Sequence, residues 1–211
     1  MKIIWHVSAL LPVLLALLLL AARPAAGRKA AKGESLVYIG TYTGGEKSKG
    51  IYAWRFHAST GELTPIGLAA EAVNPSFLAA DPGGRFLYAV SEIARHEGQR
   101  GGAVNAYAIE ASSGKLTLLN RVSSRGEGSC YLAVDKTGKA VLVANYGGGR
   151  VAAFPVQHDG RLGEASAFVQ HSGSSVNPKR QAGPHAHSIN VSPDNRFVLA
   201  ADLGLDQVLV Y

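Results

Sequence analysis

The sequence predicts an all-β protein folded as part of a β-propeller, and three observations support this fold class. After residue 35, short runs of Val, Leu, Ala and Tyr alternate with Gly, Pro, Asn and Asp, which is the pattern of consecutive strands. One segment recurs as "NPSFLAADPGGRFLYAVSE" (74–92), "GSCYLAVDKTGKAVLVANY" (128–146) and "HAHSINVSPDNRFVLAADL" (185–203). A second segment recurs with turn glycines at Gly61, Gly114 and Gly160, which lie 53 and 46 residues apart. A repeat of about 50 residues with four strands is the size of one propeller blade.

The strands of each repeat can be assigned in chain order. The first is "SFLAAD" (76–81), "CYLAVD" (130–135) or "HSINVS" (187–192), and the second is "RFLYAV" (85–90), "AVLVAN" (140–145) or "RFVLAA" (196–201). The third is "AVNAYAI" (103–109) or "VAAFPV" (151–156), and the fourth follows the turn glycine. "LVYIGTYT" (36–43) matches a second strand and "DQVLVY" (206–211) a third, so about three and a half blades are expected. Because propellers close with four to eight blades, we expect half of a ring or a fragment of a longer product.

The N-terminal residues 1–27 have the pattern of an export signal. Lys2 is followed by an apolar run, Ala9–Ala22, and then by small residues up to Gly27 that suit a cleavage site. The apolar run is shorter than the roughly 20 residues of a membrane span and contains Pro12, although a retained anchor is the alternative. We therefore expect a signal peptide at 1–27, a flexible linker at 28–35 and a partial propeller at 36–211. The mature protein would be periplasmic or extracellular, with no stable membrane association after cleavage.

Composition and charge exclude some classes of partner. The chain is 47% hydrophobic and 17% charged, with 25 glycines and a formal charge of +6, which falls to +4 without residues 1–27. Its basic residues are scattered and not interleaved with aromatic residues, so we expect no nucleic-acid partner. The only cysteine, Cys130, cannot form an intrachain disulfide, and its apolar strand predicts a place in the core.

Loop lengths predict which face carries function. The turns between first and second strands ("DPGGR", "DKTGK", "SPDNR") and between third and fourth strands ("STGE", "SSGK", "HDGR") are tight and fall on one face. The opposite face receives longer and more varied loops, which is where function concentrates on a rigid scaffold. That rim is expected to carry six side chains, Tyr42, Glu92, Tyr146, His185, His187 and Asp202.

His185 and His187 enter a first strand with a spacing of two, which puts both on one side of the strand. They would serve as a general base or as polar anchors for a substrate, or one would simply hydrogen-bond to neighbouring backbone. Glu92 would orient a water or pair with the histidines, and the alternative is pairing with an arginine or solvation. The two histidines would also suit a metal, with Glu92 or Asp202 nearby, but spacing does not identify the third ligand, so we expect no metal and no cofactor.

Other rim residues are candidates for substrate binding. Arg180, beside Lys179, and Arg150 would hold an anionic group, although solvated charges on a surface loop are the alternative. The glycines of "NYGGGR" would let a ligand approach the backbone near Asn145 and Tyr146. Asp202 occupies nearly the place of Glu92 in a later repeat, and a purely structural role is its alternative. The sequence has no nucleophile elbow, and no helix follows "NYGGGR", so it is not a phosphate-binding P-loop.

Four motifs together resemble a known family: "YIGTYTGG", "NPSFLAADPGGRFLYAVSE", "ANYGGGRV" and "PHAHSINVSPDNRFVLAADLGLDQVLVY". They are similar to the bacterial lactonase family, seven-bladed propellers related to the propeller-type 6-phosphogluconolactonase, over residues 36–211. The resemblance implies hydrolysis of a sugar lactone to its open acid, and further blades that complete the ring. A related branch forms or opens muconolactones with a histidine and with arginine and glutamate partners, and its catalytic histidine matches His187.

The residues and the resemblance together predict a metal-independent lactone hydrolase. His187, with Glu92, would activate water, and His185 or a basic rim residue would stabilise the oxyanion. Arg150 or Arg180 would hold an anionic group of the substrate. Two alternatives remain open: a non-catalytic exported propeller that binds a sugar acid or a protein, and an inactive fragment.

Overall fold

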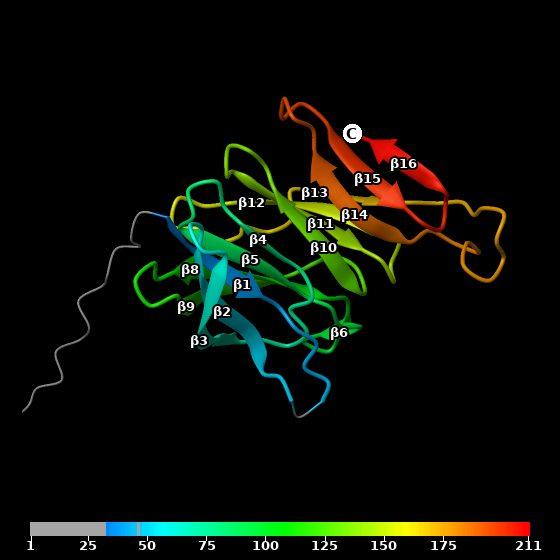
Figure 1. Cartoon of the computed structure of the whole chain (residues 1–211). Helices are drawn as coiled ribbons and strands as arrows, with labels where there is room; N and C mark the ends of the chain where they lie inside the picture. Colours follow the sequence, from blue (N-terminus) through cyan, green and yellow to red (C-terminus); the bar gives the residue numbers. More distant parts are fainter. Residues whose placement is uncertain (1–32, 46) are drawn as a thin grey trace, which may run out of the picture.

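The computed structural model describes residues 33–45 and 47–211, and every regular element in these residues is a β-strand. Figure 1 shows that the sheets follow one another in chain order, from blue to red. The signal peptide predicted for 1–27 lies outside the described residues. β1 begins at Glu34, so the last two residues of the predicted linker, 34–35, belong to the first sheet.

Each large sheet is one blade, and we number the blades in chain order. Blade 1 has the order β1–β2–β3 and blade 4 has the order β14–β15–β16, with three strands each. Their bounds are β1 Glu34–Ile39, β2 Gly50–His57, β3 Glu62–Glu71, β14 Ala186–Val191, β15 Val198–Asp202 and β16 Gln207–Val210. All neighbouring strands in them are antiparallel.

Blades 2 and 3 are complete four-stranded sheets, in the orders β4–β5–β8–β9 and β10–β11–β12–β13. The bounds in blade 2 are β4 Leu78–Ala80, β5 Phe86–Ser91, β8 Ala103–Ile109 and β9 Leu116–Ser123. The bounds in blade 3 are β10 Ser129–Val134, β11 Ala140–Asn145, β12 Arg150–Pro155 and β13 Ala167–Gln170. The four blades confirm the predicted fold class, a partial β-propeller.

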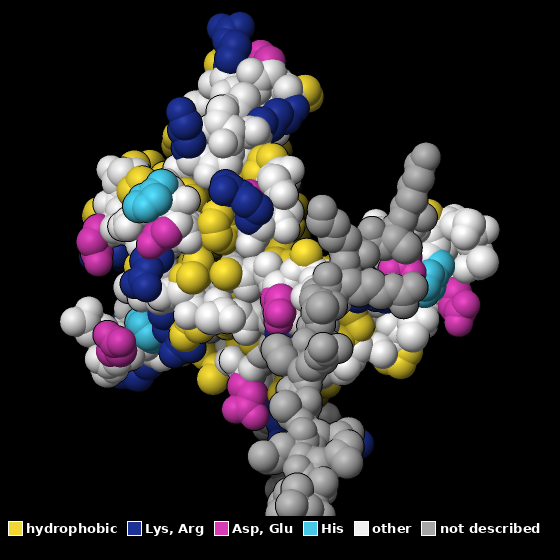
Figure 2. Space-filling model, turned by 90° about the vertical axis from the view of Figure 1, so that its left-hand side faces the viewer, with side chains coloured by type: hydrophobic (Ala, Val, Ile, Leu, Met, Phe, Trp, Pro, Cys, Tyr) yellow, Lys and Arg dark blue, Asp and Glu magenta, His cyan; other side chains and the backbone are white. Residues whose placement is uncertain are grey.

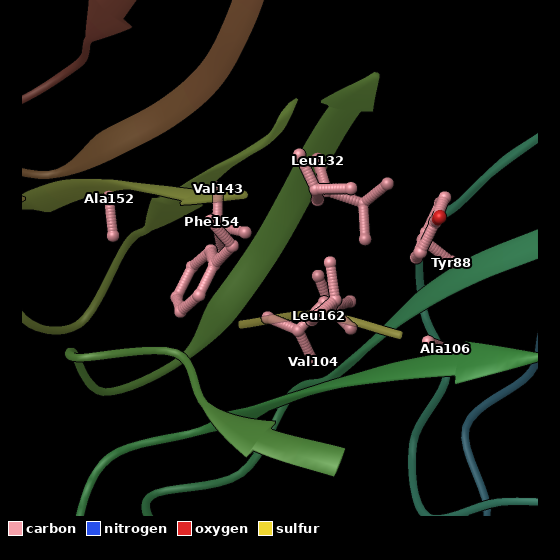
Figure 3. Close-up of a cluster of buried hydrophobic side chains, with 10 residues drawn as sticks. Tyr88, Val104, Ala106, Leu132, Val143, Ala152, Phe154 and Leu162 are labelled. Carbon is pink, nitrogen blue, oxygen red and sulfur yellow. The ribbon is translucent and has the colours of Figure 1, made fainter. Parts of the chain in front are cut away.

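Apolar side chains fill the space between blades. The largest cluster joins blades 2 and 3, and Figure 3 shows Tyr88, Leu132 and Phe154 among its side chains, on different strands. These three side chains are at most 1% exposed. Complete burial of one such side chain contributes about 2 kcal/mol. The blades are therefore held rigidly enough to position the loops between their strands.

Two local features differ from the sequence-based prediction. A two-stranded hairpin, β6 Arg95–His96 and β7 Gln99–Arg100, interrupts the loop between β5 and β8. The fourth strand of blade 3 begins only at Ala167, and a single bridge between Val156 and Leu162 precedes it. Both features lie in connections between strands, and neither changes the order of the blades.

The surface of the described residues shows no continuous basic band in the view of Figure 2, where Lys and Arg side chains are separated by neutral, acidic and hydrophobic surface. Among residues 33–45 and 47–211, no helix is long and apolar enough to span a membrane.

Candidate functional site

A hollow at the long-loop face collects polar and aromatic side chains from all four blades. Its volume is about 330 Å³, and its lining residues are Tyr42, Ser76, Glu92, Cys130, Tyr146, Arg180 and His187. Ser76, Cys130 and His187 occupy the same place at the start of the first strand in three successive repeats. Tyr42, Glu92 and Tyr146 occupy equivalent places after β1, β5 and β11, which correspond to one another in the repeat. The scaffold thus repeats two positions around the hollow and fills them with different chemistry.

Glu92 follows β5, and hydroxyl groups engage its carboxylate. The Tyr42 hydroxyl donates to Oε2 at 2.8 Å, and the Ser76 hydroxyl donates to the same oxygen at 2.5 Å. The hydrogen bond to Glu92, together with burial, raises the pKa of Tyr42, so this phenol stays protonated and continues to donate at neutral pH. The Asn74 side-chain amide also donates to the Glu92 carbonyl at 3.2 Å. These contacts fix both the backbone and the carboxylate of Glu92.

The two arginines downstream of Glu92 have other partners. Arg95 donates to the Gly98 carbonyl at 3.2 Å, within the β6–β7 hairpin. Arg100 pairs with Glu127, with 2.6 Å between Nε and Oε1. Hydroxyl groups, rather than these arginines, are therefore the partners of the Glu92 carboxylate.

Tyr146 follows β11 and is the centre of an aromatic and cationic wall. The His185 ring stacks on it, with 4.5 Å between centroids and 14° between planes, and the His187 ring meets it edge-on at 5.5 Å and 89°. Arg180 Nη2 donates to the Tyr146 hydroxyl at 3.0 Å. His185 Nδ1 lies 3.0 Å from the Tyr146 carbonyl oxygen, which can only accept, so we assign the proton to Nδ1. Both histidines contact Tyr146, but only His187 lines the hollow.

Cys130 corrects the expectation of a core cysteine, because it lines the hollow and is partly exposed. Its thiol lies 3.5 Å from the His187 carbonyl oxygen and 3.8 Å from that of Ala186. Burial, together with the charge of Glu92, raises the pKa of the thiol to about 11. Cys130 is therefore a neutral, weakly polar part of the wall at neutral pH, not an activated nucleophile.

Asn145 and Asp202 are the last residues of β11 and β15, and they are 0% and 2% exposed. Side chains alternate along a strand, so the residue before a rim position points into the interface between blades. Asn145 Nδ2 donates to the Ser124 carbonyl at 3.1 Å. Asp202 Oδ1 accepts the His185 backbone N–H at 2.7 Å. The structure does not bring these two predicted substrate-binding side chains to the hollow, and both hold backbone instead.

Arg150 and Lys179 also lie outside the residues that line the hollow. Arg150 Nε donates to the Gln170 side chain, and Nη1 donates to the Arg125 carbonyl at 3.4 Å. Lys179 belongs to a turn in which its N–H donates to Asn177 Oδ1 at 3.1 Å. Of the predicted cationic residues, the structure brings Arg180 to the hollow.

Sequence reasoning missed Ser76 and Cys130 as lining residues, and the signal for them was present. The aligned repeats place both at the position of His187, the residue singled out as the base. It also missed His171, which the structure pairs with Asp202. Within the described part of the chain, no three His, Cys, Asp or Glu side chains form a group that would hold a metal ion.

Antiparallel blades with a polar hollow built by their longer loops define a β-propeller with a candidate site at one rim. Residues 36–211 match the family model described as lactonase, 7-bladed beta-propeller. The chain belongs to this lactonase family.

Several relatives have similar sequences and structures. The 6-phosphogluconolactonase of Bacillus subtilis is 37% identical over 174 residues, which cover 82% of this chain and 48% of that protein. A solved structure from Bacteroides fragilis is 40% identical, with a TM-score of 0.78, and the match covers 84% of this chain and 48% of the chain in that structure. The periplasmic gluconolactonase of Pseudomonas aeruginosa is 35% identical, with a TM-score of 0.75, and the match covers 84% of this chain and 50% of that protein. The chain thus spans about half the length of these relatives.

Proposed function

We propose that this chain provides a lactonase site, at which water opens a sugar lactone to its hydroxy acid. The observation that carries the proposal is the hollow itself, where the His187 imidazole, the Glu92 carboxylate and the Arg180 guanidinium line one space. An imidazole and a carboxylate supply proton transfer, and a guanidinium supplies positive charge. Relatives named 6-phosphogluconolactonase and gluconolactonase support this reaction class.

In this proposal His187 is the general base. It takes a proton from water as the water oxygen attacks the lactone carbonyl carbon, which forms a tetrahedral intermediate. The ring C–O bond then breaks, and the protonated imidazole returns the proton to the departing ring oxygen. The product is the open hydroxy acid. Glu92, held by Tyr42 and Ser76, orients the water and stabilises the imidazolium.

Arg180 stabilises negative charge in the same hollow. The hydrogen bond from Arg180 Nη2 to the Tyr146 hydroxyl fixes one side of the guanidinium. The other N–H groups of the guanidinium are left to face the oxyanion or an anionic substituent of the substrate. His185 stacks on Tyr146 and keeps this wall in place. We assign Asn145, Arg150 and Asp202 to the support of the site, since their side chains bind protein groups.

The substrate class and the compartment are also proposals. A sugar lactone, with or without a 6-phosphate, matches the names of the relatives. The predicted signal at 1–27 and the periplasmic location of the Pseudomonas aeruginosa relative support export. An exported enzyme would favour an unphosphorylated lactone, because phosphorylated sugars are cytoplasmic metabolites.

The test is the rate at which the full-length protein opens gluconolactone and 6-phosphogluconolactone, measured above the spontaneous rate. We expect His187→Ala to lower kcat by about 100-fold, the usual contribution of a general base. His158→Ala is the matched control, because His158 lies in a tight turn beside Gly160 on the opposite face and is exposed. Circular dichroism and thermal unfolding verify that both variants fold.

Two results would overturn the proposal. One is a wild-type protein that leaves both lactones at their spontaneous rates. The other is a folded His187→Ala variant as active as His158→Ala. The first result would favour a propeller that binds a ligand at this rim without hydrolysing it, and the second would remove His187 from the chemistry.

A further inference from the structure

A buried pair lies directly behind the wall of the hollow. His171 Nδ1 is 2.5 Å from Asp202 Oδ2, and both side chains are fully buried. The other imidazole nitrogen of His171 lies 2.8 Å from the Tyr211 hydroxyl. The second carboxylate oxygen of Asp202 accepts the backbone N–H groups of His185 at 2.7 Å and Leu205 at 3.1 Å. One carboxylate therefore joins the end of blade 3 to the entrance of β14.

The repeat shows that the equivalent interfaces between the other blades form without such a pair. The residue after the last strand of the blade (β3, β9 or β13) is Ala72 in blade 1, Ser124 in blade 2 and His171 in blade 3. In each case its N–H donates to the carbonyl of the residue before the neighbouring strand (β2, β8 or β12). The last residue of the second strand in the following blade is Ser91, Asn145 or Asp202, respectively. All six are at most 8% exposed.

Equivalent interfaces are thus filled by Ala with Ser, by Ser with Asn and by His with Asp. A buried ionisable pair is costly to desolvate and is weak evidence for a gain in stability. The third interface is the one that adjoins His185, and the segment 171–183, which begins at His171, carries Arg180. Gln181, next to Arg180, donates to the Leu203 carbonyl at 3.0 Å and ties the end of this segment to blade 4.

We infer that the His171–Asp202 pair is a positioning element of the site. It fixes the start of β14, so that His185 stacks on Tyr146 and His187 faces the hollow, and it anchors the segment that carries Arg180. This inference rests on the proposed function for its effect on catalysis. A misplacement of a reacting group by about 1 Å costs up to about 100-fold in rate, so a loosened entrance to β14 would lower kcat more than substrate affinity.

The test grafts the pairs of the other two interfaces onto this one in the full-length protein. The first graft, His171→Ala with Asp202→Ser, replaces the acceptor for the His185 N–H by a hydroxyl on a shorter side chain, whereas the second, His171→Ser with Asp202→Asn, retains an acceptor on a side chain of the original length. We expect the first to lower kcat on gluconolactone about tenfold with KM changed less than about threefold, and the second to lower it less. If the first graft does not fold, the second decides the question.

Alkylation of Cys130 provides a readout that does not depend on activity. Its thiol lies against the Ala186 and His187 carbonyls, and it is the single cysteine in the chain. We expect iodoacetamide to modify it several times faster in the first graft than in the wild type, because a displaced β14 uncovers the thiol.

The control is Asn195→Ala, which removes a contact between the same two blades on the opposite face, where Asn195 Oδ1 accepts the Lys136 N–H at 2.9 Å. We expect this variant to lose stability but to keep the wild-type kcat and alkylation rate. Unchanged kcat and alkylation in folded grafts would overturn the inference and leave the proposed function intact. A wild type without lactonase activity would overturn the proposed function, and the alkylation rates would still decide whether the pair positions β14.

Discussion

The two faces of the propeller are built by different kinds of contact. On the tight-turn face, a side chain at the end of each first strand accepts N–H groups four and five residues later. Asp81 Oδ1 accepts from Arg85 at 2.6 Å and from Phe86 at 2.8 Å, and Asp135 and Ser192 repeat this arrangement. The same local solution recurs in three blades, so each of these turns is specified by a short stretch of sequence.

On the rim face the contacts join residues far apart in the chain. Tyr42 reaches Glu92 across 50 positions, and Arg180 reaches Tyr146 across 34. The repeat fixes where these side chains lie but leaves their chemical identity free to vary. The comparison teaches that one face maintains the fold, whereas the other uses equivalent positions of that fold to assemble a site.

The largest expected effect is a loss of activity on substitution of a charged residue at the rim. Glu92→Gln keeps the size of the side chain but removes the charge that we propose stabilises the imidazolium. We expect kcat on gluconolactone to fall about 100-fold, with the melting temperature nearly unchanged. Glu62→Gln, at the exposed start of β3 in blade 1, is the control and should retain full activity. Equal activity in the two variants would show that the rim carboxylate has no part in the chemistry.

Much of the fold could be predicted because the blades repeat. The strands predicted at 103–109 and 140–145 have the bounds of β8 and β11. The β6–β7 hairpin was missed because its signal is only the pair Glu97–Gly98, whose positive φ values of 48° and 79° are those of a tight hairpin turn. A single such pair between polar residues does not stand out from an ordinary loop.

The site could be predicted less completely, because adjacent residues at the end of a strand point to different sides. Rim residues such as Tyr146 and buried residues such as Asn145 are neighbours, and sequence alone does not say which of the two faces the hollow. The His171–Asp202 pair joins residues that are 31 positions apart across two blades. No local pattern in the sequence predicts such a pairing.

A smaller effect is expected on stability when one glycine from each face is replaced by alanine. Gly149, at the rim, has a φ of 56°, and an added Cβ would lie 2.6 Å from the Pro184 carbonyl oxygen. Gly138, in a tight turn, has a φ of 69°, but its nearest neighbour would be Pro82 at 3.4 Å. We expect Gly149→Ala to destabilise the protein by about 2 kcal/mol and Gly138→Ala by about 1 kcal/mol, from chemical denaturation.

The activities of the two glycine variants sharpen the comparison. Pro184 precedes His185, so a shift of Pro184 in Gly149→Ala should also lower kcat several-fold. Gly138→Ala should keep the wild-type kcat once it is measured below its unfolding temperature. If both variants lose activity in proportion to stability, the rim has no special sensitivity to backbone displacement.

The smallest effect concerns pH and the tight-turn face. Although burial opposes it, hydrogen bonds from Thr137 and Ala140 to Asp135 lower the pKa of its carboxyl from 3.8 to about 2. A carboxyl with a lower pKa in the folded state stabilises the fold above its unfolded pKa, and this stability is lost as pH falls through the folded pKa. Because Asp135 is only partly buried, solvent screening limits the contribution to about 1 kcal/mol.

Asp135→Asn should therefore be less stable than the wild type by about 1 kcal/mol at pH 7, and the difference should shrink between about pH 5 and pH 2. Urea denaturation at several pH values measures this change. Lactonase activity at neutral pH should stay at the wild-type level, because the turn at Asp135 faces away from the hollow. A loss of activity without a loss of stability would mean that the two faces are coupled, and the division between a structural and a functional face would then fail.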